Sequence, residues 1–338
     1  MNKKSKEEVG ESVMVNVIIP IYNARETLPK TLDSLVAQTK PLFMVTLVQD
    51  ADGIDYSDII EEYRRRGLHI KLEVLPENVG PGLARQRGID ISEQFEYLMF
   101  LDSDDLLQPR AIDVLTREVK KNDLDILSSS FVVERPGVDT YVKGDGSAST
   151  WVLGKIYRRA FLVDNGIRFA DNIRLNEDSY FNLVALNCTD KKSYIDEPLG
   201  VRRYYEKSLT QLGKENNEFF YKSNHLYIYG QIRGVLDISR IYGSVHPGTY
   251  GQTILNIYES IMKQEAYGMS DEFYREDLKE LVNSEDFKTF FSIGQNWLWI
   301  AEHVKACSKE GNDIIFFHKT FREWFEEVTN GEFTVVEK

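Results

Sequence analysis

The chain has 338 residues, of which 42% are hydrophobic, and its formal net charge is -13 with a pI near 5.0. This length and composition suffice for one large domain and a smaller one. The acidic balance argues against a protein that scans nucleic acid or lies on anionic membranes. Two widely spaced cysteines, Cys188 and Cys307, fit a reducing compartment, and we find no apolar stretch long enough to span a bilayer. We therefore expect a cytoplasmic protein.

Strand and helix patterns alternate along the first part of the chain. The polar residues 1–14 are expected to be flexible. Strands are then predicted over residues 15–20, 44–48, 70–75, 97–101 and 125–133. Helices are predicted around Leu28 to Val36, from Ser57 to the stop at Gly67, and over 82–92 and 110–121. This alternation predicts mostly parallel strands, joined by right-handed crossovers, in a sheet that helices cover on both faces.

The remainder of the chain has a helical pattern. Beyond about Gln211 the strand signals fade, and helices are predicted over 219–241, 250–267 and 287–307, with a loop over 243–251. We therefore expect three parts: a flexible segment over 1–14, an α/β domain over 15–212, and a mainly α-helical domain over 213–338.

Polar side chains follow the ends of several predicted strands: Asn23, Asp50, Asp52, Asp102 and Asp104. Because the carboxyl ends of parallel strands meet at one edge of an open sheet, and ligands bind there, these side chains should converge on one site.

The turn Asp102-Ser103-Asp104-Asp105 is the most informative of these features, because it ends a buried apolar strand in three carboxylates. Carboxylates two residues apart can hold Mg²⁺ or Mn²⁺, which favour oxygen ligands and share their shell with substrate phosphates. The same residues also suit a turn and the start of a helix.

Four motifs occur in order, over 17–23, 50–53, 77–88 and 100–105, and a fifth comprises Trp151, residues 154–159 and Asn176-Glu177-Asp178. This series, which spans about residues 15–210, resembles the family 2 glycosyltransferases of the GT-A fold. The resemblance implies a GT-A type open, mostly parallel sheet flanked by helices, with residues 15–212 as the catalytic domain. It also implies an inverting, metal-dependent hexosyltransferase (EC 2.4) that uses a nucleoside diphosphate sugar, with a UDP-sugar favoured.

By this resemblance, Pro20, Tyr22 and Asn23 line the pocket for the nucleotide base. Asp50 would accept a hydrogen bond from the base, and Asp52 lies on the same loop. The family usually has two adjacent acids at this place, whereas Ala51 separates them here, so either acid could contact the nucleotide. Arg85 would contact the base or the diphosphate.

The resemblance also gives roles to the later acids. Asp102, with Ser103 beside it, would hold the ribose, and Asp102 and Asp104 would bind Mn²⁺ or Mg²⁺. Asp178, with Glu177 next to it, would be the catalytic base. A carboxylate is ionised at neutral pH and can take the proton of an acceptor hydroxyl.

Alternatives remain for the function and for some residues. A nucleotide-sugar-binding protein without turnover would keep the same binding acids. A dehydrogenase is disfavoured, because no Gly-x-Gly-x-x-Gly follows the first strand. Arg202, Arg203 and Lys207 could clamp the diphosphate or lie on the surface. The acceptor could be a glycan, a lipid-linked sugar, a protein or a modified base, and the C-terminal helices could support a homo-oligomer.

Overall fold

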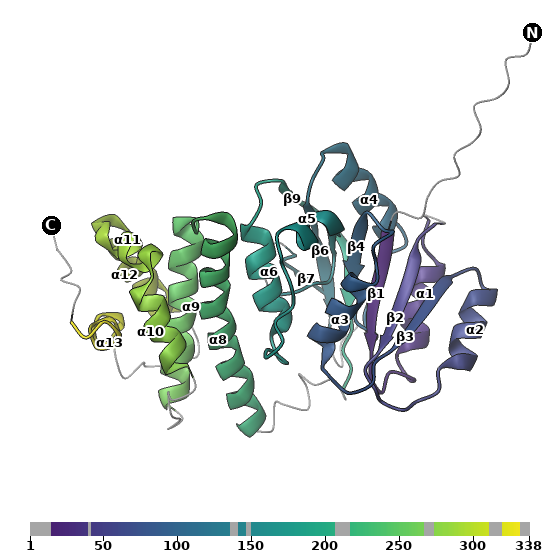
Figure 1. Ribbon diagram of the computed structural model, residues 1–338, viewed down its shortest axis with the longest axis horizontal. Helices are drawn as coiled ribbons and strands as arrows, with labels where there is room; N and C mark the ends of the chain where they lie inside the picture. The colour runs from purple at the N-terminus through teal and green to yellow at the C-terminus, as the bar shows by residue number, and fades with distance from the viewer. Residues whose placement is uncertain are drawn as a thin grey trace, which may run out of the picture. The chain divides into compact units, whose positions relative to one another are not determined.

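The computed structural model describes residues 15–39, 42–135, 141–146, 150–206, 217–266, 274–310 and 320–331. Its contacts divide the chain into two compact units (Figure 1). The sheet unit comprises Met1–Phe169 and Lys191–Tyr205, and the helical unit comprises Ala170–Asp190 and Glu206–Lys338. The expected flexible segment over 1–14 and Lys207 lie outside the described residues. The domain boundary at 212/213 stays a prediction.

The sheet unit contains a mixed, mostly parallel sheet, which confirms the predicted fold class. Its strand order is β3-β2-β1-β4-β8-β6-β9-β5, with β7 paired to β6. The strands β1 to β4 pair in parallel, whereas β8 runs antiparallel to both β4 and β6. The strand bounds are β1 Val15–Ile21, β2 Met44–Gln49, β3 His69–Val74, β4 Tyr97–Phe100, β5 Leu106–Leu107, β6 Ile126–Glu134, β7 Tyr141–Gly144, β8 Lys155–Arg158 and β9 Lys192–Arg202.

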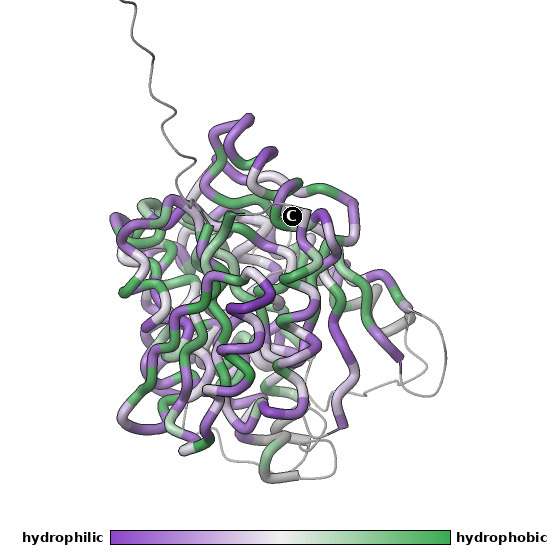
Figure 2. Tube along the Cα trace, turned by 90° about the vertical axis from the view of Figure 1, so that its right-hand side faces the viewer, coloured by the Kyte–Doolittle hydropathy of each residue, from purple (hydrophilic) through white to green (hydrophobic). Residues whose placement is uncertain are grey.

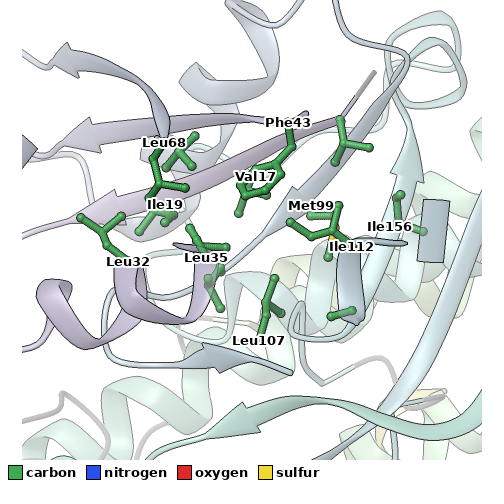
Figure 3. Close-up of a cluster of buried hydrophobic side chains, with 14 of the residues drawn as sticks. Val17, Ile19, Leu32, Leu35, Phe43, Leu68, Met99, Leu107, Ile112 and Ile156 are labelled. Atoms are coloured by element: carbon green, nitrogen blue, oxygen red, sulfur yellow. The ribbon is translucent and has the colours of Figure 1, made fainter. Parts of the chain in front are cut away.

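Helices cover both faces of the central strands. The bounds are α1 Leu28–Val36, α2 Ser57–Arg65, α3 Pro81–Asp90, α4 Ala111–Lys121 and α5 Arg159–Asp164. Because side chains alternate along a strand, Val17 and Ile19 of β1 share one face. There they join a buried cluster with Leu32 and Leu35 of α1 and Ile112 of α4 (Figure 3).

The opposite face of β1 packs against α3 through small and polar groups. Asn16 Nδ2 donates to Ser92 Oγ at 2.7 Å, and Asn16 Oδ1 accepts from Thr46 Oγ1 at 2.9 Å, so this buried amide is hydrogen-bonded at both ends. Gly88 of α3 lies directly over Ile18. This close packing fixes α3, which carries Arg85, against β1.

The helical unit confirms the predicted helical C-terminal region. Its described helices are α6 Glu177–Asn187, α8 Asn217–Tyr242, α9 Pro247–Ala266, α10 Arg275–Asn283, α11 Glu285–Ser292, α12 Gly294–Glu310 and α13 Phe321–Val328. Trp324 and Tyr258 are buried in its core, with ring centroids 5.5 Å apart.

Two local predictions in this region are wrong. The helix expected over 287–307 is broken into α11 and α12, because Ile293 is extended (φ -96°, ψ 105°) and the next helix begins at a glycine, a weak helix former. The loop expected over 243–251 ends early, since α9 already begins at Pro247. Proline suits a first helical position, where its missing N–H removes no helical bond.

Hydrophobic and hydrophilic residues alternate at short intervals along the trace (Figure 2). Among the described residues, no helix is both long enough and apolar enough to cross a bilayer.

The contact between Gly88 and Ile18 gives a test of this packing. A Cβ at position 88 would come within 2.3 Å of Ile18 Cγ2. We expect Gly88→Ala to destabilise the protein by about 1–3 kcal/mol, because β1 or α3 must move. Arg87→Ala, next to it on the same helix, removes an exposed pair with Glu73 and should cost less than about 1 kcal/mol. Urea unfolding measures both, and equal stabilities of the two variants would contradict the packing argument.

Candidate functional site

The carboxyl ends of β1, β2 and β4 lie at one edge of the sheet. Ile21 pairs with Gln49 in parallel register, and the Leu101 N–H donates to Ile18 O at 3.1 Å. The polar residues that follow these strands therefore meet at this edge, as the sequence predicts.

Asp52 holds the loops after β1 and β2 together. Its Oδ1 accepts from Gln49 Nε2 (2.6 Å) and the Ile54 N–H (3.0 Å), and its Oδ2 accepts from the Asn23 N–H (2.8 Å) and the Tyr56 hydroxyl (2.7 Å). Partial burial acts to raise the pKa of the Asp52 carboxyl, but these four hydrogen bonds hold it below its usual range. Its acceptor positions are thus taken by the protein itself.

Asp50 is buried and fixes the turn before α3. Its two carboxylate oxygens accept from the Val79 N–H at 2.7 Å and from the Gly80 N–H at 2.8 Å. Gly80 has φ +89°, a backbone conformation that favours glycine. Asp50 therefore ties the end of β2 to the start of α3, and each of its oxygens can accept a further hydrogen bond.

Pro20, Tyr22 and Asn23 form the rim of the same edge. Pro20 is half-buried at the end of β1, and Asn23 adopts φ +50°, which turns the chain toward Asp52. Tyr22 is 53% exposed, so its ring is open to solvent at the edge.

Arg85 of α3 forms an ion pair with Asp102. The distance from Nη2 to Oδ1 is 2.5 Å, and the Arg85 side chain is only 4% exposed, whereas that of Asp102 is 40% exposed. The guanidinium also lies over the Phe169 ring, 5.8 Å from its centroid. A buried cation thus orients the Asp102 carboxylate, which keeps an open side toward solvent.

The other two acids of the turn are under electrostatic strain. Burial, together with the charge of Asp102, raises the pKa of Asp104 to about 6. Burial and the charges of both neighbours raise the pKa of Asp105 well above its usual value. Asp105 Oδ1 accepts from the Arg203 N–H at 2.9 Å, and the carbonyl of the half-buried Ser103 accepts from Thr31 Oγ1 at 2.9 Å. The crowded carboxylates would gain from a further cation.

These residues fit a magnesium or manganese ion that is shared with a substrate. Within the described ranges, no group of three or more His, Cys, Asp or Glu side chains is arranged to hold a metal alone. The pair Asp102 and Asp104 supplies the one or two carboxylates with which Mg²⁺ usually binds when phosphates complete its shell.

The sequence leaves open the role of Arg202 and Arg203, and it indicates none for Asp105. The Arg202 guanidinium lies 4.0 Å from the centroid of the Trp151 ring, and its charge acts on both Asp104 and Asp105. Arg203 Nε lies 3.8 Å from a Glu134 carboxylate oxygen. Both arginines are half-buried, so neither is a purely solvated surface charge. Their place at the end of β9 is the signal that could have pointed to this edge.

Glu177 and Asp178 belong to the helical unit, where they are the first two residues of α6. Glu177 is buried and Asp178 half-buried. Asp178 Oδ1 accepts from the Ser179 N–H at 2.9 Å. Acids in the first turn are favoured by the helix dipole, so this position suits carboxylates on structural grounds too.

Comparison with known proteins matches part of the chain to one family. Residues 16–174 match Glycosyl transferase family 2. The uncharacterized glycosyltransferase EpsJ of Bacillus subtilis (strain 168) is 28% identical over 220 residues, 59% of this chain and 63% of that protein. The poly(ribitol-phosphate) beta-glucosyltransferase of Bacillus spizizenii is 29% identical over 189 residues, 51% of this chain and 29% of its own length. The chain thus spans less than two thirds of either relative.

A solved structure, Staphylococcus aureus TarS 1–349 in complex with UDP-GlcNAc, matches with a TM-score of 0.60. It covers 80% of this chain and 80% of its own, at 21% sequence identity. This likeness supports the fold of the chain.

The four hydrogen bonds of Asp52 predict a pH-dependent loss of stability in Asp52→Asn. An amide offers one acceptor oxygen, so two donors lose their partner, and we expect a cost of about 2 kcal/mol at pH 7. Because the folded-state pKa of Asp52 lies below its unfolded value of about 3.9, the wild-type advantage should be complete at pH 7 and disappear as the pH falls below about 4.

Urea unfolding at several pH values checks this expectation. Asp55→Asn is the matched control, because Asp55 is exposed and one of its oxygens accepts from the Ser57 N–H. An Asp52→Asn protein as stable as Asp55→Asn at pH 7 would show that the four bonds contribute little.

Proposed function

Because residues 16–174 belong to glycosyl transferase family 2, we propose that this chain transfers a sugar from a nucleoside diphosphate sugar to an acceptor hydroxyl. The observation that carries the proposal is the acidic turn after β4, in which Arg85 pairs with Asp102, and burial together with the charge of Asp102 raises the pKa of Asp104. The turn lies inside the matched segment and beside the ends of β1 and β2. It is arranged to receive a cation and the diphosphate that accompanies it.

For the nucleotide, we assign the contact to Asp50. The four hydrogen bonds within the protein occupy Asp52, whereas each oxygen of Asp50 accepts one bond and can accept another. An imide N–H of uracil is a suitable donor for it. The exposed ring of Tyr22 can stack on the base, and Pro20 and Asn23 would complete the rim.

UDP-GlcNAc is the first donor to test, because the TarS structure of the same fold holds it. The cytoplasm is the proposed site of the reaction, which the sparse, widely spaced cysteines support.

Asp102 and Asp104 would hold Mn²⁺ or Mg²⁺ in this reaction. The bound cation would offset the negative charge that develops on the leaving diphosphate. Arg85 holds the Asp102 carboxylate in one orientation, and Asp105 fixes the backbone at Arg203, so that both basic side chains of the 202–203 pair stay beside the turn.

Asp178 is the proposed general base, with Glu177 buried beside it. Its carboxylate takes the proton from the acceptor hydroxyl as the acceptor oxygen forms a bond to the anomeric carbon. The bond from that carbon to the diphosphate oxygen breaks in the same step, and the nucleoside diphosphate leaves. Attack opposite to the leaving group inverts the anomeric centre.

UDP binding should depend on a divalent cation. We expect Asp104→Asn to lower the affinity for UDP in Mn²⁺ by at least about tenfold, and more than Asp102→Asn does, since Asp104 is the proposed direct ligand whereas Asp102 would also hold the ribose. Calorimetry with Mn²⁺, and again after chelation, measures this difference. Asp113→Asn, which makes the same change on the exposed face of α4, should bind UDP like the wild type. Equal UDP affinity with and without the cation would disprove the assignment of the metal.

Asp178→Asn should slow turnover and leave donor binding unchanged. A general base acts on the acceptor, so we expect the release of UDP from UDP-GlcNAc, with water as the acceptor, to fall roughly 10²–10⁴-fold. Calorimetry should give the wild-type affinity for UDP. Asp171→Asn, at an exposed position seven residues earlier, is the matched control and should turn over normally. Turnover by Asp178→Asn at the wild-type rate would exclude Asp178 as the base. If the wild-type chain binds nucleotide sugars but turns none of them over, a non-catalytic protein that binds nucleotide sugars is favoured instead.

A further inference from the structure

The residue before α6 has an unusual conformation for a helix start. Asn176 occupies the N-cap position with φ 60° and ψ 24°, in the left-handed region. N-cap residues usually have extended angles, and asparagine is favoured there because its side chain can accept from the first N–H groups of the helix. Asn176 makes no such capping bond. Capping of α6 therefore explains neither the asparagine at position 176 nor its left-handed backbone angles.

The side chain of Asn176 reaches α8 instead. Its Nδ2 donates to the carbonyl oxygen of Ser223 at 2.9 Å and lies 3.0 Å from Ser223 Oγ. Nearby, Asn172 Nδ2 donates to the Tyr229 hydroxyl at 2.7 Å. The chain leading into α6 is thus attached to α8 at two points.

The two helices also pack closely along their length. A Cβ at Gly230 of α8 would lie 3.4 Å from both Ile173 Cδ1 and Tyr180 Cβ, and a Cβ at Gly234 would come within 2.6 Å of Leu183 Cδ2. Small residues on α8 therefore let α6 approach, and α6 has little freedom to shift against α8.

We propose that Asn176 is a positioning residue, which through its bonds to Ser223 sets where α6 begins and so where Asp178 lies. Asp178 is the second residue of α6, two positions after the left-handed residue. A change of backbone angles at position 176 would turn the first helical turn and move that carboxylate. This inference rests on the proposed function, in which Asp178 is the base.

Asn176 contributes a left-handed backbone conformation and a side-chain amide, and different substitutions remove one or both. Glycine adopts the left-handed conformation without strain but lacks the amide, whereas alanine lacks the amide and disfavours the conformation. Ser223→Ala removes only the hydroxyl partner and keeps the carbonyl oxygen. Asn172→Ala removes the neighbouring bond to α8 and leaves position 176 intact, which makes it the matched control.

The experiment measures UDP release from UDP-GlcNAc, with radiolabelled donor, and UDP affinity by calorimetry. We expect Asn176→Gly to lower kcat roughly tenfold, the effect of losing one or two hydrogen bonds that hold a base in place, with KM for UDP-GlcNAc and the UDP affinity unchanged. Asn176→Ala should lower kcat further and Ser223→Ala roughly threefold, while Asn172→Ala should keep the wild-type kcat.

A double-mutant cycle with Asp178→Asn tests whether Asn176 acts through Asp178. If it does, Asn176→Gly should have no further effect once the carboxylate is gone, so the double variant should turn over at the rate of Asp178→Asn alone. A wild-type kcat in Asn176→Gly, a loss of UDP affinity in step with kcat, or effects that multiply in the double variant would each overturn the proposal. If Asn176→Gly fails to fold, the same cycle with Ser223→Ala decides the question. Normal turnover by Asp178→Asn itself would instead refute the proposed base, so the two failures are distinguishable.

Discussion

The parallel pairing of β1 with both β2 and β4 is the constraint on which the site depends. It buries three adjacent strands on both faces, so their interior positions must be apolar or, like Asn16, fully hydrogen-bonded. It also forces the chain to leave each strand at the same edge. Polar side chains that are to contact a ligand can then lie only beyond the strand ends. There the Asn23 N–H donates to Asp52, and Asp102 follows β4.

At that edge the acids divide into two kinds. Asp50, Asp52 and Asp105 hold the backbone, because each accepts main-chain N–H groups from a loop that would otherwise be free to move. Asp102 pairs with Arg85, whereas burial and the charge of Asp102 raise the pKa of Asp104 to about 6. Three acids thus fix the backbone of the loops at the edge where Asp102 and Asp104 lie.

The sequence allows most of the first half of the sheet unit to be predicted. Apolar runs such as 15–20 and 97–101 have strong periodicity, and polar residues that follow them point to the edge. The strands β7 to β9 could not be foreseen, because they are short or carry polar residues and depend on pairing with β6, antiparallel for β7 and β8 and parallel for β9. Nor does sequence distinguish Asp50 from Asp52, since their roles follow from donors far along the chain, at Val79 and Asn23. The roles of Asp178 and Glu177 stay predictions that rest on the family.

The order in which the two units share the chain has a consequence for biosynthesis. The chain leaves the sheet unit after Phe169, forms α6 within the helical unit, and returns at Lys191 to add β9. A nascent chain that folds from its N-terminus must therefore complete the sheet while α6 still lacks α8, which emerges from the ribosome later. The surface of α6 that later packs against Gly230 and Gly234 would be exposed during that interval. Chaperone binding or pausing of translation would act most effectively between the synthesis of β9 and that of α8.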